Sequence, residues 1–259
     1  MSISTIKGKR INYIKEGEGE HAFVLIHGWG GTLESMRSLH NLLKKENASV
    51  IFDLPGFGQS DSPDADWGVD EYAELVVDFI KSIGLSKIVL FGHSFGGALS
   101  VYISVKYPDI VDKLILCAPS FKRNAVQEDD FKNNFWFKIK DFTKIPLYES
   151  LKPKLIYVRK LFYKILYPES DVLKHPHLES NFRKIVTQDL TPMISDIKQD
   201  TLILWGKKDT YVPLNHAHLL KEGVKKSKLI VHDTGGHGLP KFESDWVYSE
   251  IVRFMKEGL

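Results

Sequence analysis

The sequence of 259 residues has a single cysteine, Cys117, so no internal disulfide framework is possible. Apolar runs of transmembrane length are absent, and residues 1–10 contain no apolar signal core. The chain also lacks an excess of charge of one sign, because its 35 Lys and Arg residues nearly balance its 33 Asp and Glu residues. This balance argues against a nucleic-acid binder that depends on bulk charge. We therefore expect a cytoplasmic protein without a membrane span or a nucleic-acid partner; its oligomeric state is unknown.

Short apolar segments alternate with amphipathic helical patterns through most of the chain. Nearly continuous apolar strands in such an alternation are typical of a parallel sheet covered on both faces. Residues 2–15 predict a hairpin before this pattern begins. The expected strands are residues 21–26, 49–52, 87–91, 114–118, 201–205 and 228–231, and the expected helices are residues 35–45, 72–83, 98–107, 216–222 and 246–256. Cys117 falls in one of these strands, which indicates a buried thiol and not a nucleophile.

The alternation stops after Pro119 and resumes near residue 200. The intervening segment is rich in aromatic residues and is expected to form several helices. We therefore predict a core formed by residues 1–119 and 192–259, with residues 120–191 inserted as a helical cap over the C-terminal ends of the strands. The aromatic side chains of the cap could line an apolar pocket or only pack its helices together, and the sequence leaves both open.

A Gly-x-Ser-x-Gly motif within residues 92–97 is the strongest functional signal. It follows an expected strand and opens an expected helix, which is the arrangement of a nucleophile elbow. The turn is tight, so small residues must flank Ser94. The serine hydroxyl then stands at the positive end of the helix, where backbone N–H groups can stabilise a developing oxyanion.

A serine needs a base to become a nucleophile, and the base needs an orienting acid. His237 lies in a glycine-rich loop after the last expected strand and is the preferred base; His232, at the end of that strand, is second. Asp209 follows the preceding strand, which gives the order Ser, Asp, His. A turn or helix-capping aspartate is the alternative role for Asp209.

The oxyanion hole requires two backbone donors. Phe95, directly after the serine, is predicted to supply one, and Trp29 in the loop of residues 27–31 to supply the other. His93 is expected to pack beneath the elbow, and Asp53 to order the loop of residues 53–60. The pair of His175 and His177 has no third ligand cluster nearby, so no metal site and no cofactor are predicted.

These motifs together resemble the α/β-hydrolase superfamily over essentially the whole chain. The carriers of the resemblance are the segments 27–31, 53–60, 92–97, 205–209 and 235–237. The resemblance implies an eight-stranded, mostly parallel sheet with a helical cap. It also implies Ser94 as nucleophile, His237 as base, Asp209 as acid and the Trp29 and Phe95 amides as oxyanion hole.

The sequence thus predicts a serine hydrolase that cleaves a small or medium carboxylic ester through an acyl-enzyme. Trp29 replaces the second glycine of the His-Gly-Gly-Gly loop found in many lipases and esterases, which disfavours bulky tertiary-alcohol esters. Other reactions with the same triad stay open: hydrolysis of a C–C bond, thioester or lactone, aminopeptidase action, or cofactor-free perhydrolysis. A hydrolase-like ligand receptor is an alternative from a different class.

Overall fold

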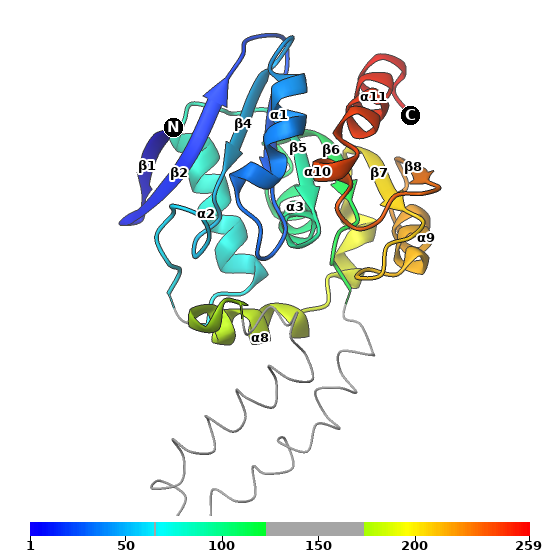
Figure 1. Ribbon diagram of the computed structural model, residues 1–259. Helices are drawn as coiled ribbons and strands as arrows, with labels where there is room; N and C mark the ends of the chain where they lie inside the picture. Colours follow the sequence, from blue (N-terminus) through cyan, green and yellow to red (C-terminus); the bar gives the residue numbers. More distant parts are fainter. Residues whose placement is uncertain (65, 123–173) are drawn as a thin grey trace, which may run out of the picture.

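An eight-stranded sheet runs through the described part of the protein (Figure 1). The computed structural model describes residues 1–64, 66–122 and 174–259. The strand order is β1-β2-β4-β3-β5-β6-β7-β8, with β1, β2 and β4 joined antiparallel and every later pair parallel. The strands are β1 (Ser2–Ile6), β2 (Lys9–Glu16), β3 (Ala22–Ile26), β4 (Ala48–Phe52), β5 (Ile88–His93), β6 (Val111–Cys117), β7 (Asp200–Gly206) and β8 (Ser227–His232).

Helices cover both faces of this sheet. Along β3, Phe23 and Leu25 pack into one apolar cluster, whereas Val24 and Ile26 pack into the other. A strand buried on both faces has this pattern, because successive side chains point to opposite sides. The helices packed in the cluster of Val24 and Ile26 are α2 (Val69–Ser82), α3 (Phe95–Lys106) and α9 (Leu214–Gly223). Those packed in the cluster of Phe23 and Leu25 are α1 (Arg37–Leu43), α10 (Leu239–Phe242) and α11 (Ser244–Glu257).

The loops after β3 and β5, which carry candidate residues, lie where the strand order reverses. The chain runs from β3 outward to β4 on one side and returns to β5 on the other. In open parallel sheets, ligands bind beyond the carboxyl ends of the strands at such a switch point. The loops after β3 and β5 therefore meet at the edge of the sheet where the sequence predicts the chemistry.

Helix α8 (Glu179–Thr187) lies across this edge of the sheet (Figure 1). Two short 3₁₀ turns flank it, η3 (Pro176–Leu178) and η4 (Thr191–Asp196); a third, η1 (Leu33–Met36), precedes α1. The Gln188 Oε1 atom accepts a hydrogen bond from the Val69 backbone N–H at 2.7 Å, and Lys184 pairs with Glu71 at 2.6 Å. These contacts fix the end of α8 to the start of α2.

The expected fold class is confirmed, and the elements differ from prediction mainly at their ends. Helix α2 begins at Val69, earlier than expected, because the Glu71 carboxylate accepts a hydrogen bond from the Gly68 N–H at 2.6 Å and caps the helix. Helix α3 begins directly after Ser94. Cys117 is fully buried in β6, as predicted. Most of the predicted cap, residues 123–173, lies outside the described residues.

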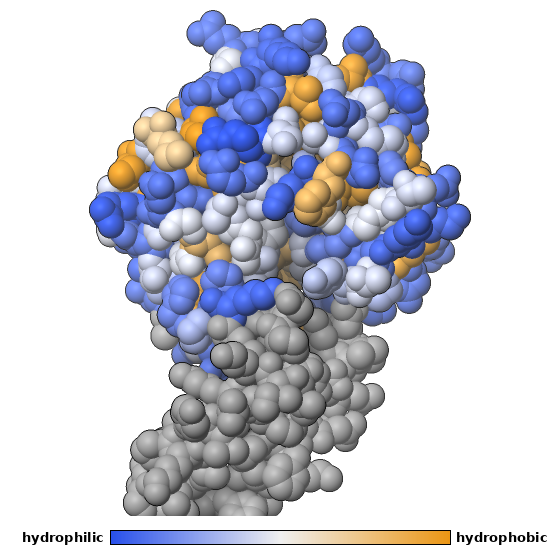
Figure 2. Space-filling view, in the orientation of Figure 1, coloured by the Kyte–Doolittle hydropathy of each residue, from blue (hydrophilic) through white to orange (hydrophobic). Residues whose placement is uncertain are grey.

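The surface in Figure 2 is mainly hydrophilic over the described part of the chain. Apolar residues on this face are scattered among charged ones. The apolar side chains of the strands are instead buried in the two clusters between sheet and helices. The apolar strands of the described segments are therefore buried by helices of the same chain.

Candidate active site

Ser94 occupies a strained turn between β5 and α3. Its φ of 53° and ψ of −114° lie outside the regions that a non-glycine residue ordinarily adopts. The Ser94 N–H donates to the Cys117 carbonyl at 3.1 Å, and the Ser120 N–H donates to the Ser94 carbonyl at 3.0 Å. Hydrogen bonds to the chain that leaves β6 therefore hold the strained residue in place.

Glycines allow the elbow to pack closely. A Cβ atom on Gly96 would overlap the Ile26 carbonyl oxygen, and one on Gly92 would overlap the Ser100 hydroxyl and the Gly96 carbonyl. A Cβ on Gly28 would lie 3.0 Å from the Ser94 Cβ. The loop after β3 thus passes directly beside the serine, as an oxyanion loop must.

The loop after β3, predicted to supply an oxyanion donor, is held by buried polar contacts. His27, fully buried, donates from Nδ1 to the Gly28 carbonyl at 2.8 Å and accepts at Nε2 from the Leu54 N–H at 3.0 Å, an assignment of protons that satisfies both neighbours. Burial lowers the pKa of His27 to about 4, so the ring is neutral near pH 7. Asp53 accepts from the Leu33 N–H at 2.7 Å and the Gln59 N–H at 2.9 Å, which confirms its predicted ordering role.

Asp209 and His237 meet although their loops follow different strands. The His237 Nδ1 atom lies 2.7 Å from the Asp209 Oδ2 atom. The other carboxylate oxygen accepts from the backbone N–H groups of Tyr211 at 2.8 Å and Val212 at 2.9 Å. The Asp209 side chain has no exposed surface, and that of His237 is 18% exposed. The carboxylate is thus fully hydrogen-bonded, and it orients Nδ1 of His237 as a donor and Nε2 as an acceptor.

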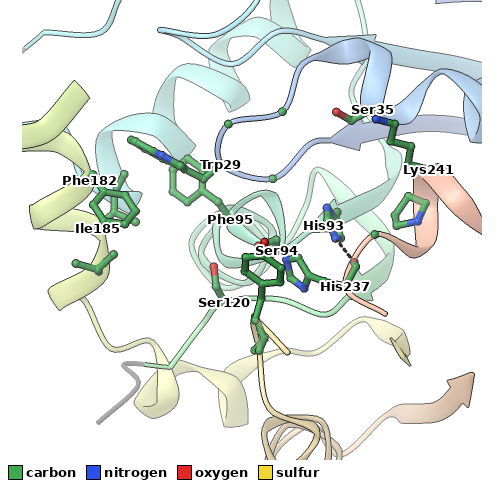
Figure 3. Close-up of a pocket in the computed structure, with 18 of the residues that line it drawn as sticks. Trp29, Ser35, His93, Ser94, Phe95, Ser120, Phe182, Ile185, His237 and Lys241 are labelled. Atoms are coloured by element: carbon green, nitrogen blue, oxygen red, sulfur yellow. Dashed lines mark hydrogen bonds between the residues drawn. The ribbon is translucent and has the colours of Figure 1, made fainter. Parts of the chain in front are cut away.

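Ser94 and His237 line one cavity of about 550 Å³ (Figure 3). Apolar side chains form one end of it, and a serine and a lysine lie at the other (Figure 3). The apolar end includes Trp29, Phe182 and Ile185, and the polar end includes Ser35 and Lys241. Among the described lining residues there is no Asp or Glu, whereas Lys122 and Lys174 add further positive charge.

The remaining histidines are placed elsewhere or in other roles. His232, the second candidate for the base, is not among the described residues that line the cavity; its ring packs on Trp246 at 4.6 Å. His175 and His177 lie 6.1 Å apart between ring centroids. Within the described ranges no group of three or more His, Cys, Asp or Glu side chains is arranged to hold a metal ion.

Sequence reasoning missed several residues around the cavity. His93 does not only pack beneath the elbow, because its Nε2 atom donates to the His237 carbonyl oxygen at 2.7 Å. The Tyr211 ring lies 5.1 Å from the His237 ring. Ser35 and Lys241 come from segments with no functional motif. Only His93 had a signal in the sequence, which is its place next to Ser94.

Residues 21–243 match the sequence profile of the alpha/beta hydrolase fold family. This chain belongs to that family. It is 29% identical over 247 residues to the AB hydrolase superfamily protein YisY of Bacillus subtilis, which covers 89% of this chain and 90% of that protein. It is 27% identical over 274 residues to a 2-hydroxy-6-oxo-6-phenylhexa-2,4-dienoate hydrolase of Comamonas testosteroni, covering 95% of this chain and 91% of that enzyme.

Solved structures show the same fold. A thermophilic esterase from Thermogutta terrifontis superposes with a TM-score of 0.77 at 20% identity, covering 99% of both chains. Within the α/β-hydrolase fold seen here, no helix of the described segments has the length and apolar character needed to cross a membrane. The family thus establishes a hydrolase fold, while the reaction has to be argued from the site.

Proposed function

We propose that this protein is a serine hydrolase that cleaves a small or medium carboxylic ester through an acyl-enzyme. The observation that carries the proposal is the placement of Ser94 and His237 on one cavity, with the His237 Nδ1 atom held by buried Asp209 at 2.7 Å. A neutral imidazole oriented in this way presents Nε2 as a proton acceptor toward the cavity. A buried aspartate that orients the base is the third part of a nucleophilic triad.

The reaction proceeds in two balanced halves. The Ser94 Oγ atom attacks the ester carbonyl carbon while His237 Nε2 takes the hydroxyl proton. The tetrahedral intermediate collapses, the C–O bond to the alcohol breaks, and His237 returns the proton to the leaving oxygen. Water then attacks the acyl-enzyme with His237 as base, and the acid leaves as Ser94 recovers its proton.

The developing oxyanion is assigned to the backbone N–H groups of Trp29 and Phe95. Phe95 is the first residue of α3, so its N–H is one of the free donors at the helix start. The Trp29 amide belongs to the loop that passes Ser94. The side-chain rings of Trp29 and Phe95 lie 5.5 Å apart. Fixed donors of this kind stabilise charge in the transition state without reorganising.

The substrate is expected to enter between the core and the predicted cap of residues 120–191. Of that cap, α8 is described, and it places Phe182 and Ile185 at the apolar end of the cavity (Figure 3). The Phe182 ring also packs on the Trp29 ring, with 5.2 Å between centroids. Phe182 therefore both lines the pocket and joins α8 to the loop after β3. An apolar acyl or aryl group fits this end.

Hydrolysis of a C–C bond is the second candidate. It is favoured by the relative from Comamonas testosteroni, which is named as a dienoate hydrolase. The cationic residues around the cavity would suit an anionic substrate of that kind. Thioesters and lactones would use the same groups, because the nucleophile, base and oxyanion donors do not depend on the leaving atom.

The test is hydrolysis of p-nitrophenyl esters from acetate to decanoate, beside a 2-hydroxy-6-oxo-dienoate, by the native protein and Ser94→Ala. We expect ester turnover that falls by on the order of a thousandfold or more in the variant. Turnover of the dienoate alone would replace the ester proposal by the C–C reaction. Ester turnover that persists unchanged in Ser94→Ala would contradict the assignment of the nucleophile.

A further inference from the structure

One side chain joins the loop of the base to the strand of the nucleophile. The Nε2 atom of His93 donates to the His237 carbonyl oxygen at 2.7 Å, shown as a dashed line in Figure 3. The two rings lie 4.8 Å apart at 45°. Because His93 directly precedes Ser94, this hydrogen bond connects the main chains of Ser94 and His237 through a single residue.

The loop of residues 235–238 needs such a connection. Glycines stand on both sides of His237, so few side chains restrain its backbone. The Gly235 carbonyl accepts from the Lys208 N–H at 2.9 Å, and the Gly238 carbonyl accepts at 3.0 Å from the backbone N–H of Lys241. Those bonds hold the two ends of the loop, and Asp209 holds the ring of His237. The bond from His93 acts at the carbonyl of His237 itself.

We propose that His93 is a positioning residue that sets the separation of Ser94 and His237 by holding the His237 main chain. The inference rests on the proposed function and deepens it, because it assigns to the same site a residue that neither attacks nor transfers a proton. In this role His93 acts through His237 and does not contact the reacting atoms.

The surroundings keep His93 in the form that this role requires. A carbonyl oxygen only accepts, so Nε2 must carry a proton. Desolvation, followed by the proximity of His237, lowers the pKa of His93 to about 3. The hydrogen bond to the His237 carbonyl and then the charge of Asp209 act in the opposite direction, whereas His27 adds to the decrease. The ring is therefore neutral near pH 7 and adds no positive charge beside His237 when that base becomes protonated.

His93 also fills space between loops. A Cβ atom on Gly28 would lie 3.2 Å from the His93 Nδ1 atom, so the ring separates the oxyanion loop from the His237 loop. Packing and hydrogen bonding must therefore be tested separately. His93→Phe keeps a ring without the donor, whereas His93→Gln keeps an N–H donor at comparable reach.

The experiment measures the rate of covalent labelling by a fluorophosphonate, per folded molecule, and kcat and KM on the best ester. We expect His93→Phe to lower the labelling rate and kcat by about 100-fold, the cost of a base displaced by about 1 Å, with KM changed less than about threefold. His93→Gln should stay within about fivefold of the native protein. His218→Phe, at an exposed position of α9 that is not among the described lining residues of the cavity, is the control and should label at the native rate.

Native labelling and kcat in folded His93→Phe would overturn the proposal, as would a folded His93→Gln no faster than His93→Phe. If His93→Phe does not fold, His93→Leu replaces it as the variant without a donor. Labelling of the native protein distinguishes a failure of this inference from a failure of the proposed function. No labelling of the native protein would remove the proposed function, whereas equal labelling of native protein and His93→Phe would remove only the role of His93.

Discussion

At the scale of single residues, the site combines one strained backbone with one fully hydrogen-bonded carboxylate. The positive φ of Ser94 projects its side chain into the cavity, and hydrogen bonds to Cys117 and Ser120 stabilise that conformation. The buried carboxylate of Asp209 is not left unpaired, because it accepts hydrogen bonds from two backbone N–H groups and from His237. The free-energy penalty for burying its charge is therefore offset. Strain and buried charge are thus concentrated where the proposed chemistry needs fixed geometry.

Asp209→Asn tests the orientation of the base. An amide can donate to Nδ1 and stabilise the wrong tautomer of His237, so kcat should fall by on the order of 10³–10⁴-fold with the fold retained. Steady-state kinetics and thermal unfolding measure the two effects. Asp233→Asn is the control, since that carboxylate is 84% exposed on the neighbouring loop. A loss below tenfold in Asp209→Asn would exclude Asp209 from the triad.

Gly96→Ala tests the close packing of the elbow. The added methyl would overlap the Ile26 carbonyl oxygen, so the free energy of unfolding should fall by about 1–3 kcal/mol. Gly236→Ala is the comparison, because the nearest atom to its Cβ, the Lys208 carbonyl oxygen, is 3.9 Å away. Equal stability of the two variants in urea would show that the elbow has more space than the structure indicates.

The sequence predicted the three triad candidates because each follows an apolar strand, and parallel strands place their following loops on one edge. The structure brings Asp209 and His237 into contact and places Ser94 on the same cavity; their catalytic roles stay a prediction. The contact of His93 with His237 joins residues 144 positions apart. It depends on the distance between two loops after folding, which no local pattern encodes.

At the scale of elements, α8 determines the apolar end of the cavity. Its Phe182 and Ile185 face the cavity, while Gln188 and Lys184 anchor the helix end to α2. The helix was expected as part of the cap. Helix α10 was not expected, because four residues containing Pro240 give no helical period to recognise.

Phe182→Ala tests whether α8 selects substrates by chain length. Loss of the ring should enlarge the apolar end and raise kcat/KM for long acyl chains relative to short ones by about tenfold. A p-nitrophenyl ester series reports this as a longer preferred chain. Thr187→Ala, on an exposed position of the same helix, should leave the preference unchanged. An unchanged preference in Phe182→Ala would place the acyl group elsewhere in the cavity.

At the scale of the whole molecule, the sheet and its two apolar clusters explain why the fold class was predictable. A strand that is apolar at every position is buried on both faces only when helices cover both sides of the sheet. The strand order was not predictable by the same argument. It depends on which strands pair across long connections, and the pairing of β3 with both β4 and β5 is visible only in the folded chain.

Burial of histidines gives the whole protein a pH-dependent stability. The folded pKa of His27 is lowered to about 4, below an unfolded value of about 6.5. The unfolded chain therefore binds this proton first as the pH falls, and stability is lost between about pH 6.5 and pH 4. Burial also lowers the pKa of His40, His93 and His216, so these histidines act in the same direction.

Urea unfolding at pH 7 and pH 5 measures this effect. His27 alone should reduce the free energy of unfolding by about 2 kcal/mol over that interval. His27→Asn should show a correspondingly smaller decrease between the same two pH values. A free energy that does not decrease toward pH 5 would mean that these histidines bind protons equally in the folded and unfolded states.

The central claim, that Ser94 is a nucleophile activated by His237 and Asp209, is tested most directly by one mass measurement. The native protein is incubated with a fluorophosphonate, weighed intact and digested to locate the adduct. The account predicts one adduct per chain, on the peptide that contains Ser94, and none in Ser94→Ala. An adduct on another residue, or no adduct on the folded native protein, would contradict it.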